Sequence, residues 1–458
     1  MRKPIHIESP GIRNLPEGEK VLSILHAALD AVDPYQAMMR AIGLQGNHLE
    51  IADRELDLTN FRNVYLIGVG KAALPMGVAA EEILGAHLSG GILVTKADPG
   101  LSESSFGLKK ARLLIAAHPI PDARSIQAAQ AIFDLLDRLD ESDLVIGLIS
   151  GGASALMASP VNNVSLADLQ RLTDQLLRSG ATINEINAIR KHLDEIKGGG
   201  LVRRAPGATI ITLVLSDVVG DPLDVIASGS TVPDRSTFQD CLRILGKYNL
   251  LASAPAAIRQ HLDRGANGDI PETLKPGELD LKKSPTKVIA NNQLACQAAR
   301  HRAHQLGFDP LYLGSFIQGE ARTVGQLFAG IARQIQKTNE PAPRPACVIA
   351  GGETTVTVRG NGRGGRNQEL ALGSVDDLDG LDNMLLVSLA TDGVDGLSDA
   401  AGAVVSGDTR SRALDKGLDP GAYLLNNDSN TFFSALGDLI YTGPTHTNVN
   451  DLIFLFAF

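Results

Sequence analysis

The sequence predicts an α/β protein of two domains, the first built on a Rossmann-like, doubly wound parallel sheet. Five short apolar runs each end abruptly in small and charged residues; they are residues 64–69, 144–149, 210–215, 347–350 and 385–390. Continuous apolar runs are typical of strands that are buried on both faces of a parallel sheet. Helical patterns alternate with these runs, which predicts βαβ units. The 47 glycines and the 44% hydrophobic content suit the many tight turns of such a fold.

The expected elements follow one another in a regular order. An amphipathic helix opens the chain, because apolar residues recur at helical spacing between Val21 and Leu29. The strand at 64–69 comes next, and residues 91–95 form another apolar segment. A second amphipathic helix, between Ile126 and Leu136, precedes the strand at 144–149. We therefore expect strand and helix to alternate over residues 20–260.

The domain boundaries are predicted from composition. Residues 264–285 are rich in glycine, proline and charge, which is typical of a linker. This places an N-terminal domain at residues 1–263 and a C-terminal domain at 286–458. The C-terminal domain closes with the apolar run 452–458, which we expect to be a buried strand.

The composition of the chain excludes several classes of function and location. A net charge of −10 argues against nucleic acid or an anionic membrane as the main partner. Three widely spaced cysteines form neither a metal pattern nor a disulfide framework. Residues 1–20 lack the apolar core of a signal peptide, and the uncharged stretch 145–161 is broken by Ser, Gly and Pro. A soluble cytoplasmic protein is the expectation.

Two glycine clusters in the C-terminal half predict a site for a charged anion. The run 347–350 leads into Gly351-Gly352-Glu353, which we expect to be a turn that carries a carboxylate. A second cluster presents Arg363, Arg366 and Asn367. Glycine lets a backbone approach a ligand closely, and the guanidinium fork matches phosphate or carboxylate. A hairpin with a flexible exposed tip is the alternative.

The turn after the strand at 64–69 fits a dinucleotide fingerprint. Residues 68–73 read Gly-Val-Gly-Lys-Ala-Ala, and in such turns a helix start receives a pyrophosphate. A nicotinamide site also needs an acid after the next strand, where this chain has Lys96 and a displaced Asp98. Lys71, inside the turn that Gly70 opens, suits a phosphate or carboxylate instead.

Ser150, Gly151 and Gly152 follow the strand at 144–149 and could cradle an anion with their backbone N–H groups. A tight turn with an N-cap serine is the alternative, and the G-x-S-x-G pattern of a serine nucleophile is absent. Arg190, on a basic helical segment, is a further candidate for contact with an anion. For Lys197 the favoured explanation is structural: the C-terminal end of a helix favours cations and is closed by glycine.

Aspartates follow two of the apolar runs, Asp217 after the third and Asp392 after the fifth. Carboxylates suit Mg²⁺, and phosphoryl transfer needs a base that orients the attacking hydroxyl. Capping of a following helix is the alternative role. Zinc patterns, the Walker A loop and the protein-kinase motifs are absent from the sequence.

Taken together, these motifs resemble the glycerate 2-kinase family, whose C-terminal part is called the MOFRL domain; some members carry the name hydroxypyruvate reductase. The resemblance covers nearly the whole chain. Its motifs are residues 68–72, 118–122, 149–154, 187–192, 216–221, 351–354, 364–369 and 391–393. The resemblance implies two unlike three-layer α/β/α domains with the active site in the cleft between them. It also implies phosphorylation of D-glycerate at its 2-hydroxyl with ATP and Mg²⁺.

The resemblance implies that Lys71 and Arg366 are essential and that Asp217 is an active-site acid, and the residue types themselves suggest the remaining roles. Lys71, Asp217 and Arg366 are expected to be catalytic, and Asp392 is the expected Mg²⁺ ligand, although the two aspartates could exchange roles. Residues expected to bind substrate or phosphate are Gly70, Ser150, Gly151, Gly152, Arg190, Glu353, Arg363 and Asn367. The chain departs from the family at Ser230, where proline is usual, and at His446, where glycine is common. The oligomeric state is left open, with a homodimer as one possibility.

Two other functions are weighed against this one. A nicotinamide-dependent hydroxypyruvate reductase is favoured by residues 68–73 and opposed by the missing ribose acid. A non-enzymatic protein that binds a phosphorylated metabolite would use the anion loops without turnover, but it leaves the carboxylates at the strand ends unexplained.

Overall fold

The computed structural model describes residues 5–97, 107–205, 207–278, 280 and 283–458. Contacts divide these residues into two compact units. One unit comprises residues 37–216 and 221–289, and we call it the N-terminal unit. The other comprises the residues up to Gln36, the short segment Asp217–Gly220 and residues 290–458, and we call it the C-terminal unit. The units therefore differ from the linear division expected from composition, since the first helices group with the C-terminal half.

The N-terminal unit is built on a six-stranded sheet. In sheet order, its strands are β6 (Ala111–Ala116), β5 (Gly90–Lys96), β4 (Asn63–Val69), β7 (Asp143–Ile149), β8 (Thr209–Leu215) and β9 (Thr286–Ala290). The pairs from β6 to β8 are parallel. All seven residues of β7 are buried, as the apolar run predicted. The strand β9, which composition assigned to the second domain, lies beside β8 at the edge of this sheet.

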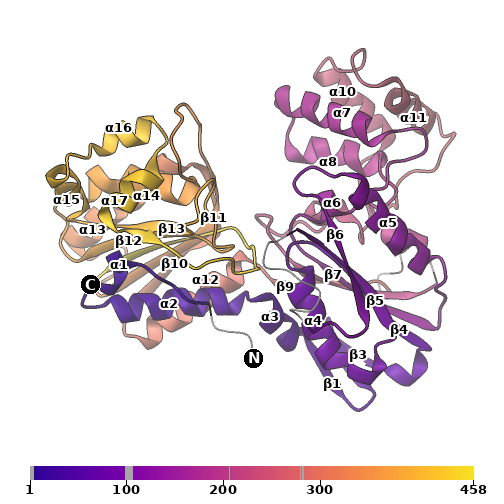
Figure 1. Cartoon of the computed structure of the whole chain (residues 1–458), viewed down its shortest axis with the longest axis horizontal. Coiled ribbons are helices and arrows are strands. Elements are labelled where there is room, and N and C mark those ends of the chain that lie inside the picture. Colours follow the sequence, from indigo (N-terminus) through magenta and orange to yellow (C-terminus); the bar gives the residue numbers. More distant parts are fainter. Residues whose placement is uncertain (1–4, 98–106, 206, 279, 281–282) are drawn as a thin grey trace. The chain divides into compact units, whose positions relative to one another are not determined.

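The order of strands reverses between β4 and β7. Strands β4, β5 and β6 follow one another outward, and the chain then returns to place β7 on the other side of β4. Helix α4 (Ala73–Leu84) follows β4, and α5 (Ala123–Leu136) precedes β7. They cover opposite faces of the sheet (Figure 1). This is the doubly wound arrangement that the sequence predicted, and its reversal point is where ligands of such folds bind.

Smaller elements complete the N-terminal unit. The antiparallel strands β1 (Ile42–Gln45), β2 (His48–Ile51) and β3 (Arg54–Asp57) form a separate sheet, with α3 (Pro34–Ala41) before it. The short helices are α6 (Ala153–Leu156) and α9 (Gly200–Arg204). Four longer helices share an apolar core of their own: α7 (Leu166–Arg178), α8 (Ile183–His192), α10 (Phe238–Lys247) and α11 (Ala256–Ala266).

The C-terminal unit has a mixed sheet rather than a purely parallel one. In order, its strands are β10 (Asp309–Glu320), β11 (Ala346–Thr355), β15 (Asp451–Ala457), β12 (Met384–Ala390), β13 (Gly402–Ser406) and β14 (Leu439–Ile440). Strand β15 is antiparallel to both neighbours, β11 and β12. It is fully buried, which confirms the terminal strand expected from residues 452–458.

Helices cover both faces of the mixed sheet. Helices α13 (Ala321–Thr338) and α14 (Arg366–Leu378) lie on one face, together with α15 (Thr409–Asp415), α16 (Pro420–Leu425) and α17 (Ser429–Leu436). Helices α2 (Gly18–Ala31), after the short α1 (Pro10–Arg13), and α12 (Asn292–Gln305) lie on the other (Figure 1). The result is three layers, with α2 packed on α12.

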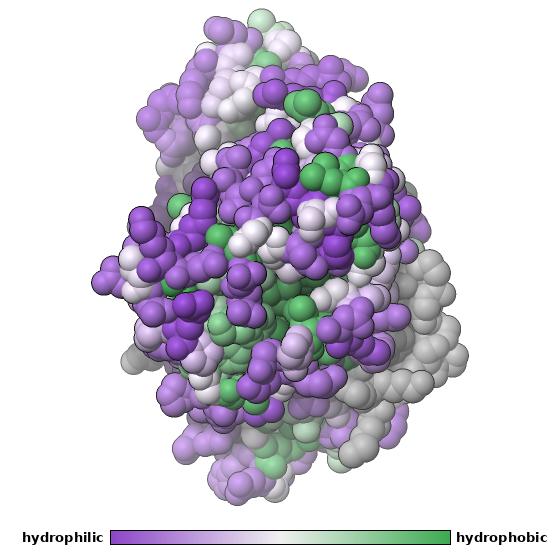
Figure 2. Space-filling view, turned by 90° about the vertical axis from the view of Figure 1, so that its left-hand side faces the viewer, coloured by the Kyte–Doolittle hydropathy of each residue, from purple (hydrophilic) through white to green (hydrophobic). Residues whose placement is uncertain are grey.

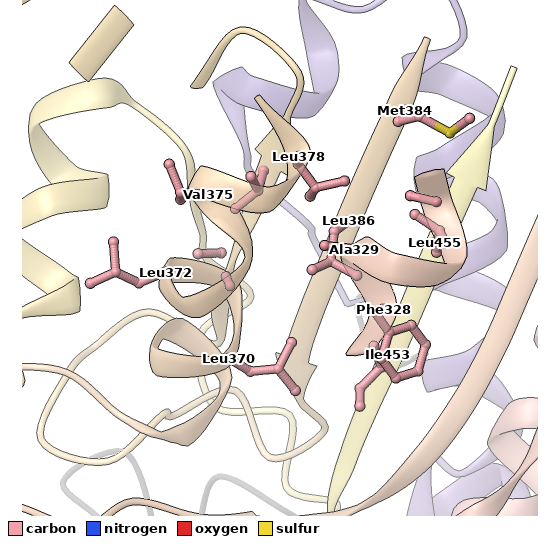
Figure 3. Close-up of a cluster of buried hydrophobic side chains, with 14 of the residues drawn as sticks. Phe328, Ala329, Leu370, Leu372, Val375, Leu378, Met384, Leu386, Ile453 and Leu455 are labelled. Atoms are coloured by element: carbon pink, nitrogen blue, oxygen red, sulfur yellow. The ribbon is translucent and has the colours of Figure 1, made fainter. Parts of the chain in front are cut away.

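The core of the C-terminal unit lies between α13, α14 and the central strands. Figure 3 shows Phe328 and Leu370 of the two helices beside Leu386, Ile453 and Leu455 of the sheet. All five side chains are almost fully buried. Burial of each such side chain stabilises the fold by about 1.5–3 kcal/mol.

The surface has no extended apolar face in the view of Figure 2, where hydrophilic residues predominate and apolar ones form small groups. Within the described part of the chain, no helix is both long and apolar enough to cross a membrane.

Candidate active site

The reversal point of the N-terminal sheet brings the two predicted glycine loops together. Lys71 N donates to Gly151 O at 2.9 Å, and Ser150 N donates to Val69 O at 3.1 Å. Gly70 has φ +139°, and a Cβ there would overlap the Ser150 hydroxyl. Only glycine permits this close approach of the two loops.

The Ser150 side chain supports the loop rather than a reaction. Its Oγ accepts a hydrogen bond from Ala72 N at 3.0 Å, and the residue is 1% exposed. Its hydroxyl therefore holds the residue that precedes α4. Ser150 is therefore not an N-cap, since Gly152 occupies that position of α6 and makes no side-chain cap hydrogen bond.

Lys71 and His118 meet at Gly152. A Cβ on Gly152 would lie 2.9 Å from His118 Cδ2 and 3.4 Å from Lys71 Cγ. Burial, and then the charges of Lys71 and Lys96, lower the pKa of His118 to about 4. The imidazole is consequently neutral at pH 7. Within the described residues no carboxylate pairs with the Lys71 ammonium, so it remains available to an anion.

Among Arg190, Lys191 and Lys197, only Arg190 lacks a carboxylate partner in the part of the chain that the structure describes. Lys191 Nζ pairs with Asp234 at 3.2 Å, and Lys197 Nζ pairs with Asp194 at 2.6 Å, all four residues being buried. Burial lowers the pKa of Arg190, and among the residues that the structure describes none pairs with its guanidinium. A half-buried cation of this kind is a natural place for an anionic group of a ligand.

The predicted acidic turn in the C-terminal half is a strand, which corrects that expectation. Gly351, Gly352 and Glu353 continue β11, and Gly352 pairs with Ile317 of β10. A Cβ on Gly351 would overlap the Asn292 side chain, and one on Gly352 would overlap the backbone of Ile317. The glycines thus admit neighbouring groups to a strand instead of forming a loop.

Arg366 is held between two carboxylates at the start of α14. Its Nη1 donates to Glu353 Oε1 at 2.6 Å, and its Nη2 donates to Asp451 Oδ1 at 3.1 Å. Its Nε lies 2.5 Å from Asp451 Oδ2, but off the N–H direction, so this contact is an ion pair rather than a hydrogen bond. Glu353 is 41% exposed and Asp451 only 5%. Asp451 is therefore the fixed anchor, and Glu353 is the partner that can move.

Burial dominates the electrostatics of this cluster. It raises the pKa of Asp451 to about 7, although Arg366 and Asn367 lower it. Burial also lowers the pKa of Arg366, but Asp451 and Glu353 outweigh this effect and hold the pKa above its usual value. Arg366 thus remains a full cation while its carboxylate partner can take up a proton near neutral pH.

Asn367 is occupied by protein partners. Its Nδ2 donates to Asp451 Oδ1 at 2.9 Å and to Asp395 Oδ1 at 3.2 Å, and its Oδ1 accepts from the Ser388 hydroxyl at 2.7 Å. Asp395 also accepts from the backbone N–H groups of Asn367 and Gln368 and so caps α14. Asn367 orients Asp451, and through it Arg366, rather than facing a ligand itself.

The structure does not bring Arg363 into this cluster. Its Nε donates to Leu397 O at 3.1 Å, and its guanidinium pairs with the exposed Asp399 at 3.3 Å. Such exposed pairs contribute little, so Arg363 can release this partner. The two arginines, three residues apart in the sequence, therefore point to different surroundings.

The two predicted aspartates both lie at strand ends. Asp392 follows β12, is partly buried, and accepts from Val394 N at 3.1 Å. Asp217 follows β8, is partly buried, and lies in the short segment that groups with the C-terminal unit. No cluster of three or more His, Cys, Asp or Glu side chains suited to a metal occurs in the described ranges. Asp98, the displaced candidate for a ribose ligand, lies outside those ranges.

Asp451 is the residue that sequence reasoning missed. The available signal was its position directly before the apolar run 452–458, on the strand that lies between β11 and β12. That placement brings its carboxylate to Arg366, which is 85 residues earlier in the chain. Pairing across a sheet at this separation has no local sequence pattern.

Comparisons with known proteins agree with this architecture. The model of a domain of unknown function, DUF4147, matches residues 20–263, and the MOFRL family matches residues 346–451. Glycerate 2-kinase of Pyrococcus horikoshii is 40% identical over 433 residues, covering 94% of this chain and 95% of the relative. A putative hydroxypyruvate reductase of Agrobacterium vitis is 41% identical over 389 residues, covering 84% and 85%.

A solved structure is similar over its whole length. The crystal structure of glycerate kinase from Thermotoga maritima has a TM-score of 0.85 to this chain at 40% identity. The match covers 97% of this chain and 100% of that one. The paired glycine loops that carry Lys71, and the arginine anchored by Asp451, thus occur in a chain that is similar to glycerate kinases from end to end. This chain belongs to the glycerate 2-kinase family and carries the two domains DUF4147 and MOFRL in that order.

Proposed function

We propose that this protein phosphorylates D-glycerate at its 2-hydroxyl, using ATP and giving 2-phosphoglycerate and ADP. The observation that carries the proposal is the Lys71 ammonium, which lies at the reversal point of the parallel sheet with no carboxylate partner among the described residues. Ligands of such sheets bind at this point. Relatives about 40% identical to this chain, named glycerate 2-kinase, support the same substrate.

The reaction needs a base and a stabilised phosphoryl group. The 2-hydroxyl oxygen forms a bond to the γ-phosphorus, and the bond from that phosphorus to the oxygen shared with the β-phosphate breaks. The hydroxyl proton passes to a carboxylate, for which we assign Asp217. This residue is partly buried at the end of β8, where a side chain is held yet reachable. Positioning and charge stabilisation carry most of the catalysis in phosphoryl transfer.

Lys71 and Arg366 supply positive charge in different ways. Lys71 has no carboxylate partner among the described residues, its backbone N donates to Gly151 O and its Cγ lies beside Gly152, so its charge suits phosphate oxygens of the nucleotide. Arg366 is fixed on one side by Asp451, while Glu353 on its other side is partly exposed. An anionic group of the substrate, carboxylate or phosphoryl, can therefore take the place of Glu353 on Arg366.

The donor chemistry of this chain fits Mg²⁺ bound mainly through the nucleotide. Mg²⁺ in nucleotide enzymes is usually held by one or two carboxylates together with substrate phosphates. Asp392 would supply one such carboxylate, since among the described residues only its Oδ1 accepts a hydrogen bond, from Val394 N. The exposed carboxylate of Glu353 is the second candidate. When bound, the ion neutralises charge on the phosphate oxygens.

The test identifies the product directly. Purified protein is incubated with D-glycerate, ATP and Mg²⁺, and the phosphorylated product is identified by ³¹P NMR. We expect 2-phosphoglycerate, and we expect Lys71→Met to lower kcat by about 100-fold or more, because its charge acts on the transferring group. Lys337→Met, at an exposed lysine on α13, is the matched control. Formation of 3-phosphoglycerate would correct the position of attack, and intact ATP would refute the kinase.

A nicotinamide-dependent reductase is the second candidate. It is favoured by the glycine turn after β4 and by the relative named putative hydroxypyruvate reductase. It is opposed by Lys96, which ends β5 where the ribose of a dinucleotide needs an acid. Oxidation of NADH or NADPH by hydroxypyruvate would support this candidate. If the absorbance of the reduced nicotinamide stays unchanged, the candidate is dismissed.

A further inference from the structure

A cavity of about 290 Å³ lies in the N-terminal unit, and none of the residues that line it belongs to the Arg366 cluster. It is bounded by residues 119–121, by α6, and by the facing sides of α7 and α8. Its walls are mainly leucine and isoleucine: Leu166, Leu169, Leu172, Leu176, Ile189 and Leu193. Apolar cavities of this size, with a few polar groups at defined places, are typical binding sites for rings of small ligands.

The polar groups of the cavity leave one net positive charge. Asp194 and Lys197 line it but neutralise each other at 2.6 Å. Asp174 lies at its exposed edge and pairs with Arg178 at 2.9 Å. Arg190 also lines the cavity, and within the described part of the chain its guanidinium has no partner. A ligand that fills this cavity would therefore combine an apolar ring with an anionic group.

The cavity adjoins the loops that hold Lys71. Helix α6 continues directly from Gly152, and its second residue, Ser154, lines the cavity. On the neighbouring wall, Pro119 follows His118, whose ring abuts Gly152 beside Lys71. A ligand with its ring in the cavity can thus extend along α6 toward the Lys71 ammonium.

The wall at Ser154 is held by a strained segment. Ala227, Ser228 and Gly229 have successive φ values of 51°, 53° and 65°, which residues other than glycine rarely adopt. The turn places Ser228 Oγ 2.9 Å from Ser154 Oγ, and Gly198 N donates to Ser228 O at 3.0 Å. Strain of this kind is retained where surrounding structure fixes it, often beside functional sites.

We propose that this cavity binds the adenosine part of the phosphoryl donor, with Arg190 paired to the α-phosphate. The proposal rests on the proposed kinase function and assigns a place to its nucleotide. The base lies between the leucines of α7 and the residues 119–121. The phosphate chain runs past Ser154 to Lys71.

Calorimetric titration with the non-hydrolysable analogue AMPPNP and, separately, with inorganic triphosphate tests this assignment. Thr173 lines the cavity and is partly buried, so Thr173→Phe fills the space of the base. We expect this variant to raise the Kd for AMPPNP about 10-fold or more and to leave triphosphate binding unchanged. Arg190→Ala should weaken both ligands about 10-fold or more, because it removes a charge-assisted contact.

Matched controls lie on the exposed side of α7, the helix that carries Thr173. Ala167→Phe adds a ring, and Arg171→Ala removes a guanidinium, at positions that do not line the cavity. Both should bind the two ligands as the unchanged protein does. An unchanged Kd for AMPPNP in Thr173→Phe, or an equal loss for both ligands in that variant, would overturn the assignment of the base.

Photolabelling of the unchanged protein avoids any question of folding. After irradiation with 8-azido-ATP, peptides from residues 119–121 or from α7 should carry the label, and label confined elsewhere would overturn the proposal. The two proposals fail separately. Labelled α7 with ATP left intact in the presence of D-glycerate refutes the glycerate kinase but supports the nucleotide cavity, whereas product formation with label elsewhere does the reverse.

Discussion

Replacing Asp451 by asparagine tests the electrostatics of the Arg366 cluster. The substitution conserves shape and removes the charge of a side chain that is 5% exposed. Asparagine can still accept from Asn367 through its oxygen, but its NH₂ group would face the Arg366 Nε that now lies 2.5 Å from Oδ2. The NH₂ group of the asparagine and the Nε–H of Arg366 are both donors, so they would repel each other. Arg366 should lose its fixed orientation, and kcat should fall about 10- to 100-fold.

The effect on stability depends on pH in a defined direction. The pKa of Asp451 is raised from 3.8 to about 7 in the folded protein. Between these values the folded state holds a proton that the unfolded state has released. The contribution of Asp451 to the free energy of unfolding is therefore greatest at low pH and falls by about 1.4 kcal/mol per pH unit across this window. Because asparagine does not titrate, the free energy of unfolding of the variant does not fall in this way as pH rises.

Urea unfolding at pH 5 and pH 7 measures the difference. Relative to the unchanged protein, Asp451→Asn should gain about 2 kcal/mol in free energy of unfolding between these two pH values. Asp399→Asn, which removes an exposed carboxylate paired with Arg363, is the control and should show no relative change. If Asp451→Asn and the unchanged protein keep a constant difference from pH 5 to pH 7, Asp451 is ionised throughout, and the reasoning from burial is wrong.

Three further predictions concern the loops. Gly70→Ala should lower the free energy of unfolding by more than about 2 kcal/mol, because its Cβ would meet Ser150 and the residue has a φ of +139°. Gly330→Ala is the control: this glycine lies in open space on α13, so alanine should raise the free energy of unfolding. The midpoints of urea unfolding measure both effects. In an NMR titration, the His118 ring should stay neutral down to about pH 5, because burial lowers its pKa to about 4. The free energy of unfolding should therefore fall on acidification from pH 6.5 toward 4. A titration midpoint near pH 6.5 would show that burial does not lower this pKa. At position 446, where φ is +62°, His446→Gly should be more stable than His446→Ala by about 1 kcal/mol in thermal melts, and equal stability would argue against strain there.

Local features of the sequence were sufficient for the strands and the loops that follow them. The five apolar runs are all strands, and the glycine turn at Gly70-Lys71 meets Ser150–Gly152 because both end neighbouring parallel strands. Parallel pairing places the carboxyl ends of strands at one edge of the sheet, so this part of the site follows from the order of elements. Residue type and spacing carry that information without knowledge of distant contacts.

The glycines before Glu353 show where a local pattern misleads. Their cluster is typical of a turn, but the structure uses them inside β11 because Ile317 and Asn292 approach the strand too closely for any side chain. Glycine is selected both where a neighbouring group must approach the backbone closely and where the backbone needs a positive φ. The sequence alone does not distinguish them.

The sequence by itself determined the fold class, the family and the cationic loop at Lys71. Only the tertiary structure decided that the first helices pack with the C-terminal sheet, that β9 completes the N-terminal one, and that Asp451 anchors Arg366. Each of these depends on contacts between segments far apart in the chain, and such contacts leave no local periodicity. They are selected by which buried surfaces and charges are complementary once the whole chain has folded.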